Sequence, residues 1–331
     1  MYQILKKICA VPSVSGREDA IRSCLADLVT PYADEVKTDA LGNLIAIRRG
    51  TAKEPRVRML CAHMDEIGFL VTFIEENGMI RVAPVGGIHW SAVAYSHVLS
   101  NKGVRGVCVP AEDAKPAEYA FDKFLIDIGA KSEKEARRKV SVGDFFVVAP
   151  SLYRLSASRI AGRPLDDRIG CAVLLELARR FWKSPPHDDL YFVFSVQEEV
   201  GCRGAKPAAF AIEPHDALVF DVTGTGDAVG AKPMACTLSG GAAIKVSDRS
   251  VICHTEVVDT LIAVAKQKKI PHQLEILNHG GTDTSAIQTA GIGSRVGAIS
   301  IPTRYIHSGT ELLDLDDAEA TCDLAEAYLR Q

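Results

Sequence analysis

The sequence predicts an α/β protein: a mixed, mostly parallel sheet flanked by helices, with a small inserted β-barrel or β-sandwich. Helical and strand-like segments alternate up to residue 65 and again from residue 159. Short strand-like runs fill most of residues 66–158. The length of 331 residues is also large for a single core. These observations predict one α/β domain made of residues 1–65 and 159–331, interrupted by a β-rich domain of residues 66–158.

The first segment predicts a helix followed by two strands. Ser15 and Glu18 resemble a capping box, and Ile21, Leu25 and Leu28 follow at helical spacing. The runs GNLIAIRRG and VRMLCAH predict strands, and the second is apolar enough to be buried on both faces. We therefore expect an amphipathic helix to begin near Ser15 and two strands of the sheet to follow it.

The middle segment consists of short strand-like runs broken by glycine and proline, and KSEKEARRK is its one helix-like stretch. The runs are FLVTFI, MIRVAPV, YSHVLS, GVRGVCV, KFLIDIG and DFFVVAP. Beyond residue 160 we expect a helix over about 167–182, strands at LYFVFSV and ALVFDV, a helix within TEVVDTLIAVAKQKK, a strand at SRVGAISI and a C-terminal helix. Residues 66–158 therefore resemble a small all-β unit.

Composition and charge exclude several classes of function. The formal net charge of -4 offers no basic excess for binding a polyanion, so we expect no nucleic-acid partner. No apolar run reaches the length of a membrane span, and charge and Pro12 interrupt the only signal-like stretch at the N-terminus. The nine cysteines are scattered and form no CxxC pair, which is typical of reduced thiols. We expect a soluble cytoplasmic protein with no membrane partner.

Acids and histidines gather at the ends of the predicted strands and at a helix start. In an open α/β sheet these positions line the crevice at the carboxyl ends of the strands. Taken alone, each has a structural explanation: a histidine at a strand end, a helix N-cap, a solvated strand end or a turn-forming aspartate. The positions are His63 with Asp65 in CAHMDEIGF, Asp166 with Asp167 in GRPLDDRIG, Glu198 with Glu199 in FVFSVQEEVG, Asp221 in ALVFDVTG, His279 with Asp283 in NHGGTDTSAIQ, and His307 in RYIHSGTEL.

Two of these motifs carry specific expectations. Asp65 lies two residues after His63, so it shares a face with the histidine in extended chain and could orient the imidazole. Glu198 and Glu199 follow a strongly apolar strand, where a carboxylate is costly to bury unless it is paired or bound to a metal ion. Because adjacent strand residues point to opposite sides, we expect different roles for the two glutamates.

The combined set points to a metal site. Histidine and carboxylate ligands without cysteine suit zinc, cobalt or manganese better than a structural zinc finger. One carboxylate shared between two ions, with a histidine and a carboxylate for each, is the economical two-metal arrangement. The sequence thus predicts two divalent ions, with zinc or cobalt as the first expectation and manganese as the alternative.

At this point the chain resembles a known family along nearly its whole length. The motifs CAHMDEIGF, PLDDRIGCAV, SVQEEVGCRGA, FDVTGTGD, HGGTDTSAIQ and RYIHSGTEL are similar to the successive signatures of the tetrahedral aminopeptidases, the glutamyl or deblocking aminopeptidases of the dinuclear metallopeptidase clan. The segments FDKFLIDIGAKSEKEA and VGDFFVV are similar to that family's dimerisation domain. The resemblance implies a homo-oligomer, with dimers combining into a tetrahedral dodecamer that admits short peptides with a free N-terminus.

The resemblance also implies a role for each site residue. Asp166 would bridge both ions, His63 and Asp221 would complete one site, and Glu199 and His307 the other. Glu198 would be the general base, acting on a water that bridges the ions, and Asp65 would hold His63. The peptide bond after Asp166 would be cis. Asp167 stands where many relatives have asparagine, and its extra acid would alter metal affinity or pH dependence.

Three other functions compete with an aminopeptidase. A glycan hydrolase, the endoglucanase label of some relatives, needs two carboxyls about 5 to 9.5 Å apart across a sugar, which neighbouring glutamates do not naturally provide. A non-catalytic metal-binding assembly protein would lack a ligand or the base, and here none is missing. A carboxypeptidase or deacylase would carry a different insert. The preferred side chain, the native metal and the physiological substrate stay open, and we expect Lys245 and Arg249 to be surface charges.

Overall fold

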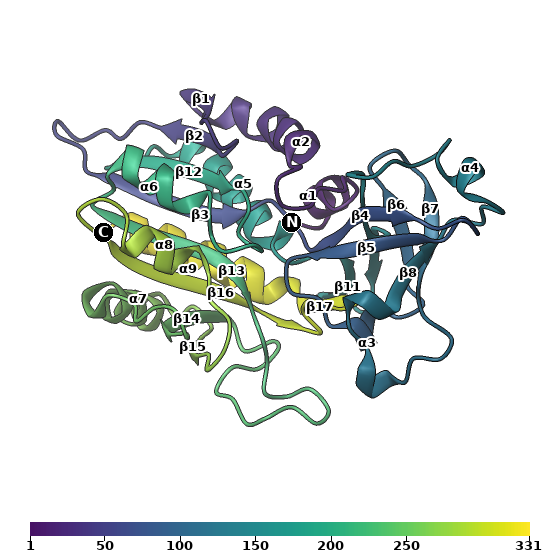
Figure 1. The fold of residues 1–331 in the computed structure, drawn as a ribbon. Helices are drawn as coiled ribbons and strands as arrows, with labels where there is room; N and C mark the ends of the chain where they lie inside the picture. The colour runs from purple at the N-terminus through teal and green to yellow at the C-terminus, as the bar shows by residue number, and fades with distance from the viewer.

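The computed structural model describes residues 1–331 as a large α/β body with a β-barrel projecting from one end (Figure 1). The body contains an 11-stranded mixed sheet. Its main path runs, in spatial order, through β1 (Glu35–Thr38), β2 (Leu44–Arg48), β12 (Asp189–Ser195), β3 (Val57–His63), β13 (Asp216–Thr223), β16 (Arg295–Arg304), β17 (Glu311–Asp314), β11 (Arg159–Arg163) and β10 (Ser151–Arg154). Two further strands, β14 (Ala242–Ser247) and β15 (His272–Ile276), extend from β16.

Parallel pairing is concentrated at the centre of the sheet. The neighbours β12, β3, β13 and β16 are parallel to one another, as are β14 and β15, and the remaining pairs are antiparallel. The mixed α/β sheet predicted from the sequence is confirmed. Strands β12, β3 and β13 are almost entirely buried, as expected for parallel strands covered on both faces.

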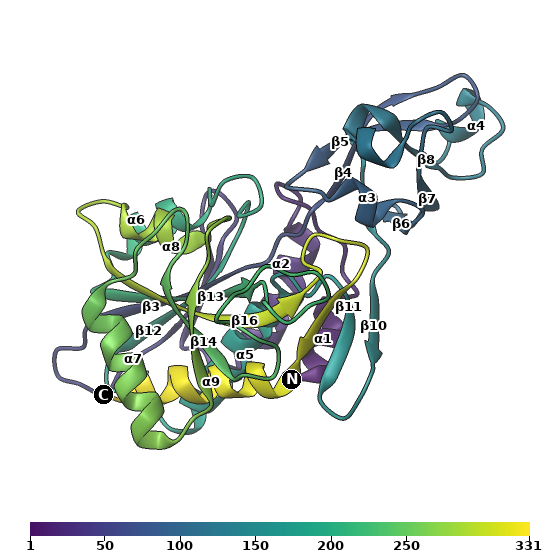
Figure 2. The ribbon, with the colours of Figure 1, turned by 90° about the horizontal axis from the view of Figure 1, so that it is seen from below.

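Helices cover both faces of the sheet, as Figure 2 shows. One face carries α5 (Arg168–Lys183), α9 (Leu315–Leu329) and α7 (Thr255–Lys268), with α1 (Tyr2–Ile8) and α2 (Asp19–Val29) against α5. The other carries α6 (Ala205–Ile212) and α8 (Asp283–Gln288). The expected helix after residue 167 is α5, and the side chain of Asp167 caps it by accepting a hydrogen bond from the Gly170 amide. No helix combines the length and apolar character needed to cross a membrane.

The inserted strands close into a six-stranded antiparallel barrel, as the sequence predicts for a small barrel or sandwich. Around it lie β4 (Gly68–Ile74), β5 (Ile80–Val85), β8 (Phe124–Asp127), β7 (Arg105–Pro110), β6 (His97–Ser100) and β9 (Phe145–Val148). The short helices of this part are α3 (Trp90–Val93) and α4 (Glu133–Ala136), with 3-10 turns at Pro116–Glu118 and Phe121–Lys123; a third such turn, Thr30–Tyr32, follows α2. Its apolar core of 15 buried residues is separate from the 62-residue core of the body, and a small cluster of Val14, Phe145 and Val147 joins the two parts.

Two local expectations are wrong. Helix α2 begins at Asp19 rather than near Ser15, and its N-cap residue Glu18 makes no side-chain capping bond. The Ser15 hydroxyl instead donates to Asp65, far along the chain. Strands β14 and β15 were not predicted from the sequence, and neither were the short strands β1, β10, β11 and β17. As a consequence Lys245, expected on the surface, lies fully buried in β14, whereas Arg249 is exposed as expected.

Candidate active site

The candidate residues meet at the carboxyl edge of the central parallel strands. His63 ends β3 and is paired in register with Ser195, the last residue of β12, so Glu198 and Glu199 follow from the adjacent strand. Asp221 lies near the end of β13, the neighbour of β3 on its other side. Parallel strands therefore bring groups that are far apart in sequence to one edge.

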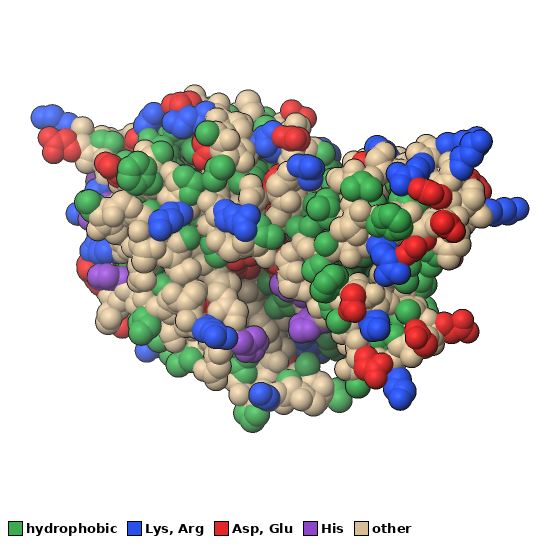
Figure 3. Space-filling view, viewed as in Figure 1, with side chains coloured by type: hydrophobic (Ala, Val, Ile, Leu, Met, Phe, Trp, Pro, Cys, Tyr) green, Lys and Arg blue, Asp and Glu red, His purple; other side chains and the backbone are tan.

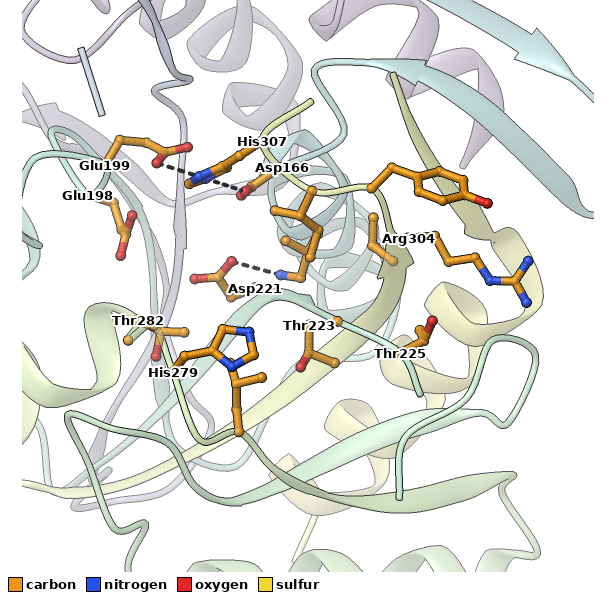
Figure 4. Close-up of a pocket in the computed structure, with 18 of the residues that line it drawn as sticks. Asp166, Glu198, Glu199, Asp221, Thr223, Thr225, His279, Thr282, Arg304 and His307 are labelled. Carbon is orange, nitrogen blue, oxygen red and sulfur yellow. Dashed lines mark hydrogen bonds and ion pairs between the residues drawn. The ribbon is translucent and has the colours of Figure 1, made fainter. Parts of the chain in front are cut away.

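Asp166 lies at the centre of the group and contacts both histidines. Figure 4 shows His307 between Asp166 and Glu199. Its Oδ1 lies 3.1 Å from His63 Nε2 and its Oδ2 lies 3.2 Å from His307 Nε2. Glu199 Oε2 lies 3.0 Å from His307 Nε2. Asp221 Oδ1 lies 3.9 Å from His63 Nε2. The two histidines thus contact different oxygens of Asp166, with Asp221 near His63 and Glu199 near His307.

Asp65 lies behind the site and hydrogen-bonds to several of its residues. Its carboxylate accepts the backbone amides of Glu198 and Glu199, at 3.1 and 3.2 Å, and the Ser15 hydroxyl at 2.6 Å. The nearest atom of Asp65 to His63 Nδ1 is its backbone carbonyl oxygen at 3.2 Å, and a carboxylate oxygen follows at 3.5 Å. Asp65 therefore positions the glutamate pair as well as the imidazole of His63.

The buried Glu311 fixes the backbone on which Asp166 sits. Its carboxylate accepts the amides of Leu165 and Asp166, at 2.6 and 3.1 Å, and pairs with Arg163 at 2.8 Å. The peptide bond between Asp166 and Asp167 is cis, as the resemblance implied. Glu311 was not predicted as a site residue; the available signal was its place at the end of the motif that contains His307.

A glycine in the loop after β5, on the barrel side of the site, was also not predicted as a site residue. The loop after β5 brings Gly86, with φ +78°, against Glu199. A Cβ atom at Gly86 would lie 3.1 Å from Glu199 Cβ and 2.7 Å from the Ile67 side chain, so a larger residue would displace the glutamate. The body and the barrel loop therefore both shape the site.

The electrostatics of the group favour a cation. Burial raises the pKa of Glu198 well above its usual range, and the neighbouring charge of Asp221 raises it further. Burial opposes the protonated form of His307, but its bonds to Asp166 and Glu199 raise the pKa of the imidazole to about 11. Burial also works to raise the pKa of Asp166, yet hydrogen bonds from both histidines hold it well below the usual range. Burial and the close contacts between carboxylates and histidines thus produce these shifts, and the unpaired acids among them favour a cation.

The donor set fits metal ions. The ligand atoms of His63, Asp166 and Glu199 lie within 4.8 Å of one another, as do those of His63, Asp167 and Asp221. Glu199 Oε1 and Asp167 Oδ2 are buried without any hydrogen-bond partner. Because a buried carboxylate oxygen is costly to leave unpaired, these free oxygens indicate places for cations.

The group opens into a cavity of about 380 Å³. In Figure 3 acidic and histidine side chains are visible where the surface is hollowed between the body and the barrel. The far walls are formed by the loops after β13, before α8 and after β16, and include Thr223, Thr225, Leu277, His279, Thr282, Arg304 and Tyr305. The cavity is large enough for a peptide end, and its acids lie at one side.

Lys245 forms part of a buried polar network below this cavity. Register pairs it with Glu275 across β14 and β15, and its Nζ donates to Glu275 Oε1 and lies 3.4 Å from Asp248 Oδ2. Thr223, which lines the cavity, also donates to Glu275 Oε1 at 2.8 Å. Burial works to lower the pKa of Lys245, but the Glu275 carboxylate beside it leaves the pKa raised. Cross-strand pairing with an acid therefore explains why this lysine is buried.

The sequence and the fold are both similar to known aminopeptidases. The family model described as M42 glutamyl aminopeptidase matches residues 42–324. The chain belongs to this family. A lysyl aminopeptidase of Pyrococcus furiosus is 36% identical over 346 aligned positions, which cover 100% of this chain and 97% of that protein. This chain is accordingly a metal-dependent aminopeptidase, a hydrolase of peptide bonds.

Solved structures of aminopeptidases have the same fold as this chain. An aminopeptidase of the archaeon Desulfurococcus kamchatkensis superposes with a TM-score of 0.94 at 35% identity, over 99% of this chain and 94% of the other. The TET1 peptidase of Pyrococcus horikoshii, described as assembling into a tetrahedron or a large octahedral shell, superposes with a TM-score of 0.90 at 32% identity, over 100% and 99% of the two chains. The resemblance to the tetrahedral aminopeptidases is confirmed.

Proposed function

We propose that this chain removes the N-terminal residue of short peptides at a site for two divalent cations bridged by Asp166. His63 and Asp221 complete one cation site, and Glu199 and His307 the other. The observation that carries this proposal is the position of Asp166, whose two oxygens face His63 and His307 at 3.1 and 3.2 Å. A single cation would need only one of these two groupings, so the split supports a pair.

The cations and the protein contribute different parts of the chemistry. When bound, two such cations supply Lewis acidity that activates water and polarises the scissile carbonyl. Histidine and carboxylate donors suit zinc or cobalt, with manganese as a further candidate. Asp65 and Glu311 hold the donor residues in place through the backbone contacts described above.

Glu198 is the general base in this proposal. Its Oε2 lies 3.9 Å from His63 Nε2, at the rim of the donor group, and its side chain is 12% exposed toward the cavity. It takes a proton from the attacking water and delivers it to the departing amine. Because burial raises the pKa of its carboxylate, Glu198 is a stronger proton acceptor than an exposed glutamate.

The first test is Glu198→Gln. We expect the variant to keep its bound cations and to lose about a hundred- to ten-thousandfold in kcat on an aminoacyl chromogenic amide, the range typical of a lost general base. Metal content by elemental analysis and kcat by absorbance are measured on the same samples. The exposed Glu76→Gln, on the barrel, is the matched control. Near-normal turnover with full metal content would remove Glu198 from this role.

The acids of the cavity also support a requirement for a free α-amine. A protonated or metal-associated amine suits a pocket edged by Glu198, Glu199 and Asp221, whereas an acetylated N-terminus offers no cation. We expect a short peptide to be cleaved and its N-acetylated form to be resistant. Equal cleavage of both peptides, followed by mass spectrometry, would contradict the requirement.

A glycan hydrolase remains the alternative, because a Thermotoga maritima protein named endoglucanase superposes at 32% identity and a TM-score of 0.83. In this chain Glu199 is engaged by His307, and the carboxylate near Glu198 on its other side, Asp283, lies within 4.8 Å, closer than the roughly 5 to 9.5 Å separation that a glycosidase needs. Hydrolysis of aminoacyl amides but not of a soluble glucan, abolished by a chelator, distinguishes the two functions.

We further propose that residues 1–65 and 159–331 form the catalytic domain and that residues 66–158 form a dimerisation domain. The separate barrel core and the exposed Phe73, Tyr95 and Phe121 support an assembly role for the barrel. By analogy with the TET1 peptidase, dimers combine into a tetrahedral dodecamer in the cytoplasm, where the nine free cysteines would stay reduced. Light scattering that gives a monomer would overturn the assembly proposal.

A further inference from the structure

Glu198 faces two different groups of donor atoms. Its Oε2 lies toward His63 in the site described above. Its Oε1 lies 3.2 Å from the Sγ atom of Cys202. The turn after β12 produces this contact, because the Cys202 amide donates to the Glu198 carbonyl at 2.8 Å and the residue takes a left-handed conformation with φ +53°. The thiol is therefore folded back onto the side of Glu198 away from His63.

Asp283 completes this second group. Ligand atoms of Glu198, Cys202 and Asp283 all lie within 4.8 Å of one another. Asp283 is 1% exposed, and its Oδ2 accepts the Ser195 hydroxyl. Its Oδ1 is buried with no hydrogen-bond partner. An unpaired buried carboxylate oxygen is costly, so a donor group of this kind favours a cation beside it.

We propose that Glu198, Cys202 and Asp283 form a third cation site that binds a soft divalent cation, such as zinc in excess or cadmium, and inhibits the enzyme. Sulfur selects soft cations, and the three negative charges of two carboxylates and a thiolate more than neutralise a divalent cation. The thiol proton leaves to the solvent as the cation binds. The site is distinct from the pair at Asp166, because it uses the opposite oxygen of Glu198 and shares no other residue with it.

Inhibition follows from the position of Glu198. This part rests on the proposed role of Glu198 as the base: a cation held on Oε1 fixes the carboxylate beside Cys202 and Asp283, so the carboxylate is not free to carry a proton from the attacking water to the departing amine. A cation that occupies the third site therefore slows turnover without displacing the cations at Asp166. The site would make the enzyme sensitive to an excess of the same metal class that activates it.

The test uses holoenzyme already loaded with two equivalents of zinc, titrated with Cd²⁺ alone. Two signals are followed on the same sample: the ultraviolet charge-transfer absorption of a cadmium–thiolate bond, and the hydrolysis rate of an aminoacyl amide relative to each variant's own rate without cadmium. Cys202→Ser removes the thiolate. Cys24→Ser, on α2, is the matched control, because Cys24 is also partly exposed but lies outside this group.

We expect one further equivalent of Cd²⁺ to bind and inhibit the wild type and Cys24→Ser. In Cys202→Ser the absorption disappears and the half-inhibitory concentration rises about tenfold or more, because loss of even a residue that supports a ligand costs about 10- to 100-fold in affinity. Equal absorption and inhibition in wild type and Cys202→Ser overturn the third site. Binding through Cys202 without inhibition supports the site and counts against Glu198 as the base, which separates the two proposals.

Discussion

The body and the barrel use burial in opposite ways. Within the barrel strands and their connections, Ser100 and Asp144 are the buried polar residues, and the core is otherwise apolar. At the carboxyl edge of the body's sheet the chain instead buries His63, Asp65, Asp166 and Asp221, with Glu311 behind them. Hydrophobic burial alone accounts for the barrel, whereas the body buries charged groups whose desolvation its apolar core must offset.

This difference shows where the chemistry is concentrated. A buried carboxylate is retained when it is paired, hydrogen-bonded or available to a cation, and the edge of the sheet shows all three. Within the body itself, Arg163 with Glu311 and Lys245 with Glu275 are fully buried ion pairs. Substitutions in the two parts should therefore have different effects. At the edge of the body's sheet they should reduce enzyme activity, and in the barrel core they should reduce the stability of the fold.

The largest expected effect comes from Asp166→Ala. Because both histidine-containing groups share this residue, we expect the variant to lose both cations and more than about a thousandfold in kcat/KM, since the cations supply several kcal/mol of transition-state stabilisation. Elemental analysis after dialysis checks the metal content. The exposed Asp259→Ala on α7 is the control. Two cations retained by Asp166→Ala would contradict the bridge.

Lys245→Met tests the buried ion pairs of the body. Removing the lysine leaves Glu275 and Asp248 buried without their cation, so we expect a loss of about 3–5 kcal/mol in the free energy of unfolding. Urea denaturation followed by fluorescence measures it. Arg249→Met, four residues along and exposed, should change stability by less than about 0.5 kcal/mol. Equal effects of the two substitutions would mean that the network does not stabilise the fold.

Phe124→Ala tests the apolar core of the barrel. Phe124 is buried and packs against Trp90 and Tyr119, with ring centroids 4.9 and 5.0 Å away. We expect about 3–5 kcal/mol of destabilisation, the range for a phenylalanine truncated in a core. Phe121→Ala, three residues earlier and 53% exposed, is the control.

The two tryptophans of the chain separate the parts in this experiment. Trp90 reports on the barrel, and Trp182 lies in α5 of the body. In a Trp182→Phe background, where only Trp90 in the barrel fluoresces, Phe124→Ala should lower the denaturation midpoint. In a Trp90→Phe background, where only Trp182 in the body fluoresces, the same substitution should lower the midpoint less. Identical shifts from both reporters would show that the two cores unfold as one unit.

The smallest expected effect is a pH dependence at Glu18. Burial raises the pKa of Glu18 from 4.5 to about 7. The folded chain therefore binds the proton more tightly than the unfolded chain, and this stabilisation is complete below pH 4.5 and lost as the pH rises through 7, by on the order of 2 kcal/mol. Glu18→Gln keeps the acceptor for the Gly16 and Gln197 amides but cannot titrate.

The check is the thermal midpoint at pH 5 and pH 8. The wild type and the exposed Glu54→Gln control should lose more stability between these values than Glu18→Gln does. A pH dependence unchanged by Glu18→Gln would mean that this carboxyl does not titrate differently on folding.

By itself, the sequence determined the main features of the fold and the positions of the candidate site. The alternation of helical and strand-like runs predicted the α/β body, and the short runs of residues 66–158 predicted the barrel, because hydrophobic period and turn residues are local properties. The apolar strands that end at His63, Glu198 and Asp221 indicated one crevice, because parallel strands place their carboxyl ends at the same edge.

The tertiary structure decided which partners each residue has. Ser15 bonds to Asp65 instead of capping a helix, Glu311 reaches the amide of Asp166, and Lys245 is buried because β14 pairs with β15. The contact of Cys202 with Glu198 likewise depends on the turn after β12. Each of these contacts depends on how strands pair and turns close in three dimensions. Hydrophobic periodicity is a local property of the chain, so it cannot predict partners that are distant in sequence.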